Sequence, residues 1–538
     1  MKNMKKIASL LLVLLMVVGM MSTTAWAAGN HEVNITGVSG KQEFEAYQIF
    51  AGDYYEGVLS NIKWGSGVNL EENAKVKLTV TVDGQEQELE KTATEWADFL
   101  AENIDDTDLA KSFAQAISYH LTDDPTSYTK VADGADTATF TGLEDGYYLF
   151  KNAEGGVAND ESYTQFMLQV VGNLNVPVKA DTPESDKSIT GVEEKPVEPA
   201  NYKGVDVNIG DTVEFTLTFK LPENYSAYEK YYIRFNDTMS NGLTFGKITS
   251  VKVLEGDEEK QTLASPEDYT AVTPEEGAAG GKLTITIEDL TKAGDFKAGD
   301  VVTVVYTVTL NSDAVIGNPG NTNTLTVDFS NDPNESGEGK TGTTPEDKAV
   351  VFTFELDGNK VDGNDETPLS GAEFKLQATT GDHAGKWAMV DEKTGKITGW
   401  TDDKTQASVV TSDANGNFKF IGLGAGEYDL YETKAPDGYN EVTDPIHLTV
   451  TATYRTDAAT GQQVVDTLNI TITVGEDPTP TPGNTETGAV QIEVENNKGA
   501  TLPSTGGIGT TIFYAVGGLL AVGAVILLIT KRRMNTEE

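Results

Sequence analysis

The chain has no cysteine, although its N-terminus indicates export from the cytoplasm. Residues 1–27 have lysines at the start, an apolar run and the small-residue sequence Ala25-Trp26-Ala27, which predicts a signal peptide cleaved after Ala27. Exported proteins often depend on disulfides for stability. This chain must therefore gain its stability from large domains or from another kind of link.

A second apolar run lies at the other end, at residues 510–530, and is long enough to cross a bilayer. The basic residues Lys531, Arg532 and Arg533 follow it and predict that the tail 531–538 stays in the cytoplasm. The region between the two apolar ends is expected to be extracellular. Its acidity, in a chain with a formal net charge of −45, argues against nucleic acid or anionic membranes as partners.

The extracellular region divides into three parts, expected at 28–186, 187–347 and 348–499, separated by Pro-, Glu- and Gly-bearing segments. Short runs rich in Tyr, Val and Thr predict a mainly β chain of tandem immunoglobulin-like β-sandwich domains. The first domain is expected to be α+β. It contains one predicted helix over 92–121, which starts with a Thr92 to Glu95 capping box.

One strand-like stretch, Glu427 to Tyr439, carries a charge on its apolar face. Period two places Glu432 on the same face as Tyr428 and Leu430. Burying an unpaired carboxylate is costly. Glu432 must therefore lie at a solvated rim or have a partner inside the domain.

The pentapeptide Leu502, Pro503, Ser504, Thr505 and Gly506 lies just before the second apolar run. Together with the apolar span and basic tail, it resembles the LPxTG cell-wall sorting signal of Gram-positive surface proteins. The resemblance implies that a sortase thiolate attacks the Thr505 carbonyl, releases the chain from Gly506 onward and passes the acyl group to an amine.

The third region resembles a Cna B-type domain of Gram-positive pilins, on the segments KVDGNDETPLSGAEFKL and YETKAPDGY. The resemblance implies an isopeptide bond from the Lys360 amine to Asn496, with Glu432 as the catalytic acid. Strand parity agrees, because Lys360 shares a face with Phe354 and Asn496 shares one with Val494. The neighbouring Asn497 is the alternative acceptor if a bulge shifts the register.

The middle region resembles the central domain of fimbrial isopeptide-forming backbone pilins, on FNDTMSNGLTF and NTLTVDFSN. There the resemblance implies Lys187 as the amine, Asp237 as the acid and Asn331 as the acceptor. Parity again fits, since Phe235 shares a face with Asp237, and Phe329 shares one with Asn331.

Desolvation supplies a mechanism for both bonds. An apolar core lowers the pKa of a lysine and raises that of a carboxylic acid, so the amine can be nucleophilic while the acid shuttles a proton to departing ammonia. The reaction occurs once per molecule and needs no cofactor or metal. In the N-terminal domain Lys151 stands where Glu432 would, so no bond of this type is expected there.

Two functions compete. In the first, the chain is a pilus shaft subunit whose Thr505 is joined to a lysine of the next copy; Lys179 in Val176-Pro177-Val178-Lys179 partly resembles the acceptor element of backbone pilins. In the second, it is a monomeric wall-anchored adhesin that binds a host ligand. The first predicts a cell-wall-anchored pilus, with pilin and housekeeping sortases, peptidoglycan, tip or base pilins and host surface ligands as partners. A secreted enzyme has little support, because the four histidines are scattered.

Overall fold

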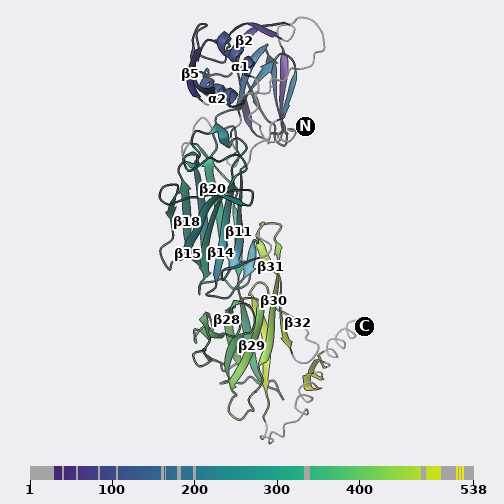
Figure 1. Cartoon of the computed structure of the whole chain (residues 1–538). Coiled ribbons are helices and arrows are strands. Elements are labelled where there is room, and N and C mark those ends of the chain that lie inside the picture. Colours follow the sequence, from purple (N-terminus) through teal and green to yellow (C-terminus); the bar gives the residue numbers. More distant parts are fainter. Residues whose placement is uncertain are drawn as a thin grey trace, which may run out of the picture.

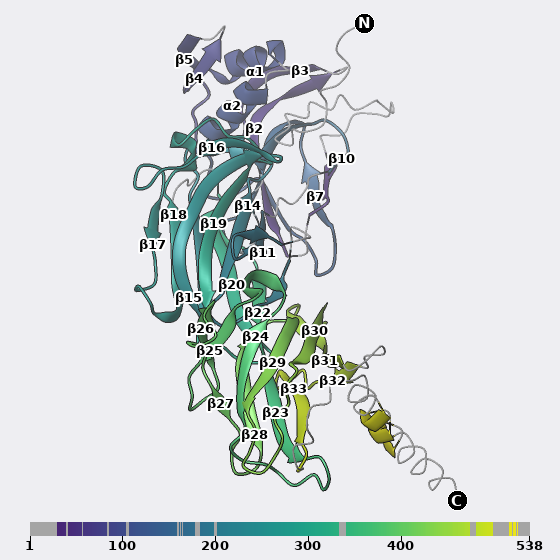
Figure 2. The same cartoon turned by 60° about the horizontal axis from the view of Figure 1, so that its bottom comes forward.

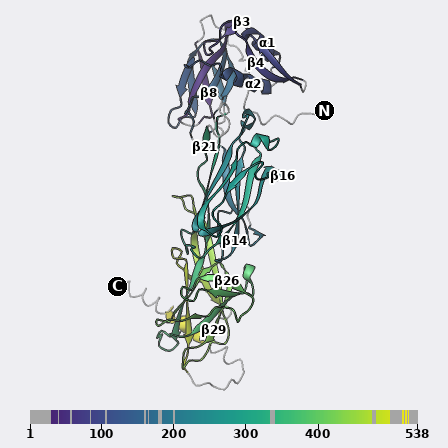
Figure 3. The same ribbon diagram turned by 90° about the vertical axis from the view of Figure 1, so that its left-hand side faces the viewer.

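The computed structural model of the chain describes residues 30–38, 41–55, 58–82, 85–103, 107–158, 161, 163, 165–177, 183–197, 202–332, 340–473, 480–498, 516–518, 520–522 and 524–525. Three β-rich domains follow one another in a row, with the N-terminal domain at one end (Figure 1). The two rotated views show the same end-to-end order (Figures 2 and 3). The molecule is mainly β and elongated, which confirms the predicted fold class.

The N-terminal domain has two β layers and a helical layer. Its strands are β1 (His31–Thr36), β2 (Glu43–Tyr55), β3 (Val58–Trp64), β4 (Val76–Val82), β5 (Gln85–Lys91), β6 (Ser127–Lys130), β7 (Thr137–Leu143), β8 (Gly146–Asn152), β9 (Gln165–Val170) and β10 (Leu174–Pro177). The sheet β3-β2-β8-β9 packs on the sheet β10-β1-β7 through one face. The other face of the sheet β3-β2-β8-β9 packs on the helices, because Tyr47, Ile49 and Leu149 belong to the core cluster that contains the helical residues. The domain is thus α+β, as predicted.

The predicted single helix is divided in two, α1 (Ala93–Glu102) and α2 (Thr107–Ser118). The capping box is present, with the Thr92 backbone N–H donating to Glu95 Oε2 at 2.8 Å. The first helix ends because Asn103 caps it: both its backbone N–H and its side-chain amide donate to the Phe99 carbonyl. The sequence pattern thus identified the start of the helix and missed its interruption.

The middle domain is built from one continuous, strongly curved set of strands. These are β11 (Glu184–Val192), β12 (Lys195–Pro196), β13 (Gly204–Asp206), β14 (Thr212–Lys220), β15 (Ile233–Glu255), β16 (Glu258–Thr262), β17 (Thr270–Val272), β18 (Ala279–Ile287), β19 (Val301–Leu310), β20 (Asn321–Ser330), β21 (Thr341–Thr343) and β22 (Asp347–Phe352), with 3-10 turns at Tyr225–Ala227 and Leu290–Lys292. The long strand β15 pairs with β18 and β20 through its first part and with β19 through its second. One strand thus belongs to both halves of the sandwich.

The strand pairing moves both boundaries of the middle domain relative to the expected limits of 187 and 347. Strand β11 starts at Glu184 and pairs with β14, so the domain begins three residues earlier. Strand β22 pairs with β20 and β13, so the domain continues to Phe352. The polar, Gly-rich segment before 347 is a connection between strands of one sheet.

The C-terminal domain is a two-sheet sandwich. Its strands are β23 (Phe354–Asp362), β24 (Glu373–Ala378), β25 (Trp387–Val390), β26 (Ile397–Thr401), β27 (Val410–Thr411), β28 (Asn417–Leu423), β29 (Gly426–Lys434), β30 (Ile446–Thr456), β31 (Gln463–Thr473), β32 (Pro480–Pro482) and β33 (Ala489–Asn496), with a 3-10 turn at Gly381–His383. One sheet has the order β28-β23-β33, and the other includes β24-β29-β30-β31. The first and last strands of the domain, β23 and β33, are parallel neighbours.

The middle and C-terminal domains share one hydrophobic core cluster. Polar contacts seal its edge: His383 Nε2 lies 2.6 Å from Asp211 Oδ1, and Asn318 Oδ1 accepts from the Val465 backbone N–H at 2.8 Å. Gly317 and Gly488 meet backbone to backbone, so a Cβ on Gly488 would lie 2.4 Å from the Gly317 nitrogen. This joint is as closely packed as a domain interior.

The joint between the N-terminal and middle domains is polar. The Asn331 carbonyl accepts from the Tyr163 backbone N–H at 2.7 Å, and Asn224 Nδ2 donates to the Tyr163 carbonyl at 3.2 Å. Lys340 forms an ion pair with Glu154 at 3.4 Å. No described residue of the N-terminal domain belongs to the core shared by the other two domains.

The two predicted apolar ends and the sorting motif fall largely outside the described residues. The signal peptide, the predicted acceptor Lys179 and the sorting motif 502–506 all lie outside the described residues. Helical backbone occurs at 516–518, 520–522 and 524–525, within the predicted span. Among the described residues, no helix combines the length and apolar character needed to cross a membrane.

We expect Gly488→Ala to open the joint between the middle and C-terminal domains, because the added methyl group collides with the Gly317 backbone. Gly461→Ala is a matched control: the two glycines have φ of 70° and 69°, but nothing lies within 4 Å of a Cβ at Gly461. Both variants carry the left-handed strain of about 1 to 2 kcal/mol. Only Gly488→Ala should raise hydrogen exchange at the Val465 amide. Equal exchange in the two variants would contradict the close contact.

Candidate functional site

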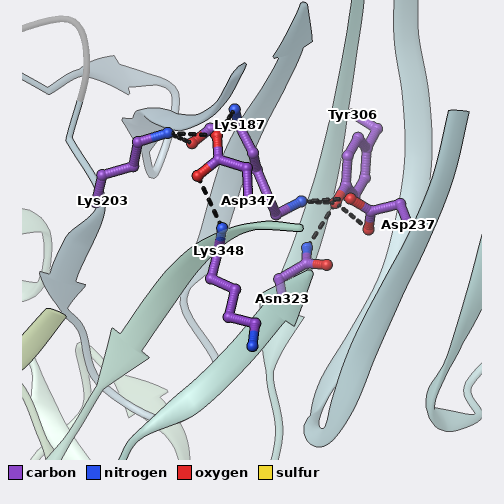
Figure 4. Close-up of polar contacts among 7 residues, drawn as sticks. All are labelled: Lys187, Lys203, Asp237, Tyr306, Asn323, Asp347 and Lys348. Carbon is purple, nitrogen blue, oxygen red and sulfur yellow. Dashed lines mark hydrogen bonds and ion pairs between the residues drawn. The ribbon is translucent and has the colours of Figure 1, made fainter. Parts of the chain in front are cut away.

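A lysine amine lies in the apolar core of the middle domain. Lys187, on β11, has a side chain with 0% exposure, as does its ion-pair partner Asp237 on β15. Lys187 Nζ also donates to the Tyr306 hydroxyl at 3.0 Å (Figure 4). The predicted amine and the predicted acid are therefore in direct contact.

Strand β11 is held in place by a second, partly exposed cluster. Asp347 Oδ2 accepts from the Lys187 backbone N–H at 2.7 Å and from Lys203 Nζ at 2.7 Å (Figure 4). Asp347 begins β22, so this contact ties the first strand of the domain to the last one. It brings the Lys187 side chain over β20 and the first part of β15.

An asparagine completes the centre, and it is Asn323. Asn323 lies on β20 opposite Met239 of β15, two residues from Asp237. Its amide nitrogen donates to the Tyr306 hydroxyl at 2.6 Å (Figure 4). Asn323 is fully buried, and its amide oxygen has no hydrogen-bond partner in the described structure. A buried carbonyl without a hydrogen bond lowers the stability of the fold. The Asn323 carbonyl is thus free to accept a hydrogen bond.

Asn331, the acceptor predicted from the sequence, lies elsewhere. It follows β20 at the joint with the N-terminal domain, where its carbonyl accepts from Tyr163. Eight residues of extended chain separate it from Asn323, about 26 Å at the usual strand rise. Asn331 is therefore not the amide at this centre. Asn323 shares its face of the strand, and parity cannot distinguish positions along one face.

The Tyr306 hydroxyl stands at the middle of the network. It donates to Asp237 Oδ1 at 2.7 Å while accepting from Lys187 and Asn323. Its ring stacks on Phe215, with centroids 5.8 Å apart. The sequence offers a signal for this residue that was missed: Tyr306 shares the buried face of β19 with Val304 and Val308, where a hydroxyl needs partners.

Burial dominates the electrostatics of this centre. It lowers the pKa of Lys187 below the usual value for an amine, against the opposing effect of Asp237. Burial, together with the Asp237 charge, also holds the pKa of Tyr306 well above 10, so the phenol keeps its proton. Lys187 Nζ lies 4.6 Å from the Phe215 ring centroid. The surroundings of the amine are thus apolar and aromatic.

The C-terminal domain contains a second centre, made of the three residues predicted for it. Lys360 on β23 and Glu432 on β29 have side chains with 0% exposure, and Lys360 Nζ lies 3.7 Å from Glu432 Oε1. Asn496 on β33 donates from Nδ2 to Glu432 Oε2 at 2.9 Å. Glu432 thus contacts both predicted reactants directly.

Backbone groups fix the geometry of this second centre. Lys360 Nζ donates to the Val494 carbonyl at 2.9 Å, and Glu432 Oε2 also accepts from the Val442 backbone N–H at 2.7 Å. Glu432 Oε1 and Asn496 Oδ1 have no hydrogen-bond partner among the described residues. Asn497, the alternative acceptor, is exposed. The register therefore needs no bulge.

Burial lowers the pKa of Lys360 to about 8, with Glu432 acting in the opposite direction. At neutral pH a fraction of this amine, about one in ten, is uncharged. Such an amine is a usable nucleophile, unlike an ordinary surface lysine.

The N-terminal domain differs. Lys151 on β8 forms an ion pair with Glu45 at 3.3 Å, but its side chain is 25% exposed. In the C-terminal domain Asp413 lies in a turn, where its carboxylate accepts from the backbone N–H groups of Asn415 and Asn417. The described ranges contain no group of three or more acidic or histidine side chains arranged to hold a metal.

Known protein families match three parts of the chain. Residues 209–333 match the Cna-B-like domain of Gram-positive pilin backbone subunit 2, and residues 354–464 match the SpaA prealbumin-like fold domain. Residues 494–536 match the LPXTG cell wall anchor motif. The chain is a sortase-assembled major pilin.

Individual proteins are similar to this chain over most of its length. The trypsin-resistant surface T6 protein of Streptococcus pyogenes serotype M6 is 25% identical over 97% of this pilin and 99% of its own length. The solved T6 backbone pilin of that serotype has a modular three-domain structure, and it covers 89% of this chain and 100% of its own at 18% identity and a TM-score of 0.53. The full-length major pilin SpaD from Corynebacterium diphtheriae is 17% identical, over 88% and 98%, with a TM-score of 0.47.

The pilin is therefore a structural subunit of a pilus shaft that is anchored to the cell wall. Its LPXTG motif implies processing by a sortase and polymerisation into a pilus. Asp237, Tyr306 and Asn323 lie within the match at 209–333, and Lys360 and Glu432 lie within the match at 354–464. Lys187 and Asn496 lie outside these two segments.

Proposed function

We propose that this shaft subunit closes its middle and C-terminal domains with self-formed isopeptide bonds, Lys187 to Asn323 and Lys360 to Asn496. The observation that supports this most is the burial of each amine beside a carboxylate, with an asparagine amide in the same network. A buried ion pair contributes little to the free energy of folding, because the cost of desolvating the two charges offsets their attraction. A centre that reacts once and becomes a neutral amide removes that cost.

The chemistry balances without a co-reactant. A proton moves from the lysine amine to the neighbouring carboxylate, which leaves two neutral groups in an apolar site. Lysine Nζ then bonds to the asparagine Cγ, and the Cγ–Nδ2 bond breaks. One proton passes from Nζ to the leaving nitrogen through the acid, and ammonia departs. In the C-terminal domain Glu432 performs this transfer directly, because it contacts Asn496 Nδ2.

Each bond would perform the role of a disulfide in a chain without cysteine. By analogy, closing a loop of over 100 residues restricts the unfolded chain by roughly 4 to 5 kcal/mol. Strand β33 leads toward the sorting motif and neighbours β23, so the bond from Asn496 to Lys360 would carry tension from one terminal strand to the other.

Between subunits, we propose that a pilin sortase joins Thr505 of one copy to Lys179 of the next. Lys179 falls between β10, which ends at Pro177, and β11, which starts at Glu184. The precursor would span the membrane through 510–530 until sortase releases it, and a housekeeping sortase would attach the finished polymer to peptidoglycan. The pilus would support adhesion together with tip or base pilins. The alternative, a monomeric adhesin, predicts no polymer.

The first test counts the ammonia lost from the mature chain by intact-mass measurement. We expect two losses in the wild type and one in Asn323→Ala, because that variant has no acceptor in the middle domain. Asn331→Ala is the matched control, since it lies on the same strand face outside the centre, and it should still lose two. Asn331→Ala with one loss, or a third loss located in the N-terminal domain, would contradict the assignment.

The second test uses pH. The pKa of Lys360 is lowered to about 8. The uncharged fraction of this amine therefore rises about tenfold for each unit by which the pH increases toward 8, and it levels off above 8. Formation of the Lys360–Asn496 bond should therefore accelerate as pH rises from about 6 to 8. The full chain, synthesised in a cell-free system and diluted from denaturant into each buffer, would be followed by mass spectrometry of the crosslinked peptide. A rate that falls over this range would exclude the neutral amine as nucleophile.

The third test concerns the polymer. Lys179→Ala should abolish the ladder of very large species in a denaturing gel of cell-wall extract. Lys41→Ala is the control, because Lys41 is a 77% exposed lysine of the same domain. A ladder that survives Lys179→Ala would reject this acceptor, and a wild type without any ladder would favour the monomeric adhesin.

A further inference from the structure

The two centres use carboxylic acids of different length. In the C-terminal domain Glu432 reaches Asn496 Nδ2 directly, at 2.9 Å. In the middle domain the acid is Asp237, which is one methylene shorter. Its carboxylate contacts Lys187 and the Tyr306 hydroxyl, and the amide nitrogen of Asn323 donates to that hydroxyl instead, at 2.6 Å. A phenol thus stands between the acid and the amide.

We propose that Tyr306 is a catalytic residue of the middle domain, whose hydroxyl relays a proton between Asp237 and the leaving nitrogen of Asn323. This inference rests on the proposed Lys187–Asn323 bond. It also explains how an aspartate can serve in a centre whose counterpart uses a glutamate. The phenolic oxygen supplies the reach that the shorter acid lacks.

The hydrogen bonds give the direction of the relay. Before the reaction the Tyr306 hydroxyl donates to Asp237 Oδ1 and its oxygen accepts from Asn323 Nδ2. Once Asp237 has taken a proton from Lys187, the carboxyl group becomes the donor to the phenolic oxygen. The phenol O–H then turns to the leaving nitrogen, gives up its proton and receives the one from Asp237. In total Nζ loses two protons: the first reaches ammonia through Asp237 and Tyr306, and the second, released as the amide forms, goes to Asp237. Tyr306 is unchanged.

The packing around Tyr306 suits this role. The ring is fully buried and lies between Phe215 and Phe245, with centroids 5.8 and 6.1 Å away, so the hydroxyl is held in place. Burial keeps the phenol protonated by raising its pKa well above 10. The hydroxyl contacts the Lys187 amine as well, at 3.0 Å. It therefore touches the nucleophile, the acid and the leaving group.

The test compares Tyr306→Phe with Tyr225→Phe in the full chain. Tyr225 is a buried tyrosine of the same domain whose hydroxyl has no hydrogen-bond partner within the described residues. Tyr306→Phe keeps the stacked ring and should slow formation of the Lys187–Asn323 peptide crosslink about 100-fold or more, the usual scale of acid–base catalysis. Tyr225→Phe should form it at the wild-type rate. The Lys360–Asn496 bond reports in each molecule that the chain has folded.

A rescue separates catalysis from packing. In Asp237→Glu with Tyr306→Phe the longer acid should reach Asn323 as Glu432 reaches Asn496, and crosslinking should return to within about tenfold of wild type. A merely structural tyrosine would not be replaced by a longer carboxylate, so an uncrosslinked double variant overturns the relay. Tyr306→Phe that crosslinks at the wild-type rate overturns it too. A wild type that retains the ammonia at Lys187 and Asn323 would instead refute the proposed bond, and the relay with it.

Discussion

The burial of two lysine amines is the constraint on which the rest of this pilin depends. Each ammonium group leaves water, and the cost of its desolvation must be met by a carboxylate in contact and by polar groups around it. In the middle domain this requires Asp237 and Tyr306 to converge on Lys187 from two other strands. The strong curvature of that sheet, with β15 passing through both halves, brings those strands together.

The two centres solve one physical problem with different strand geometry. In the C-terminal domain the amine and the amide lie on adjacent parallel strands, β23 and β33, and the acid approaches from the facing sheet. In the middle domain the amine lies on β11, and the acid and the amide lie on neighbouring antiparallel strands opposite it. A Glu in the first case and an Asp with a phenol in the second span the resulting separations.

Much of this arrangement could be predicted from the sequence, because strand parity separates buried from exposed positions. Parity placed Lys360, Asn496, Glu432 and Asp237 on core faces, and all four are buried. Parity repeats every two residues, however, so it could not choose between Asn323 and Asn331. That choice depends on the register of β20 against β15, which is set by contacts far apart in sequence. The break between α1 and α2 was missed for a similar reason, since Asn103 fits a helical pattern until its side chain caps the Phe99 carbonyl.

The proposed links also give a reason to expect no crosslink in the N-terminal domain. If tension enters a subunit at Lys179 and leaves at Thr505, the pulling force does not pass through the N-terminal domain. Within that path, a bond from Lys187 to Asn323 shields the strands between them, and a bond from Lys360 to Asn496 shields most of the C-terminal domain. The stretch left to carry load runs from Asn323 to Lys360 along β20 and β22 and across the joint with the C-terminal domain. That joint is the one packed as a continuous hydrophobic core, whereas the joint to the unloaded N-terminal domain is polar. The placement of apolar packing thus follows the route that force would take through the shaft.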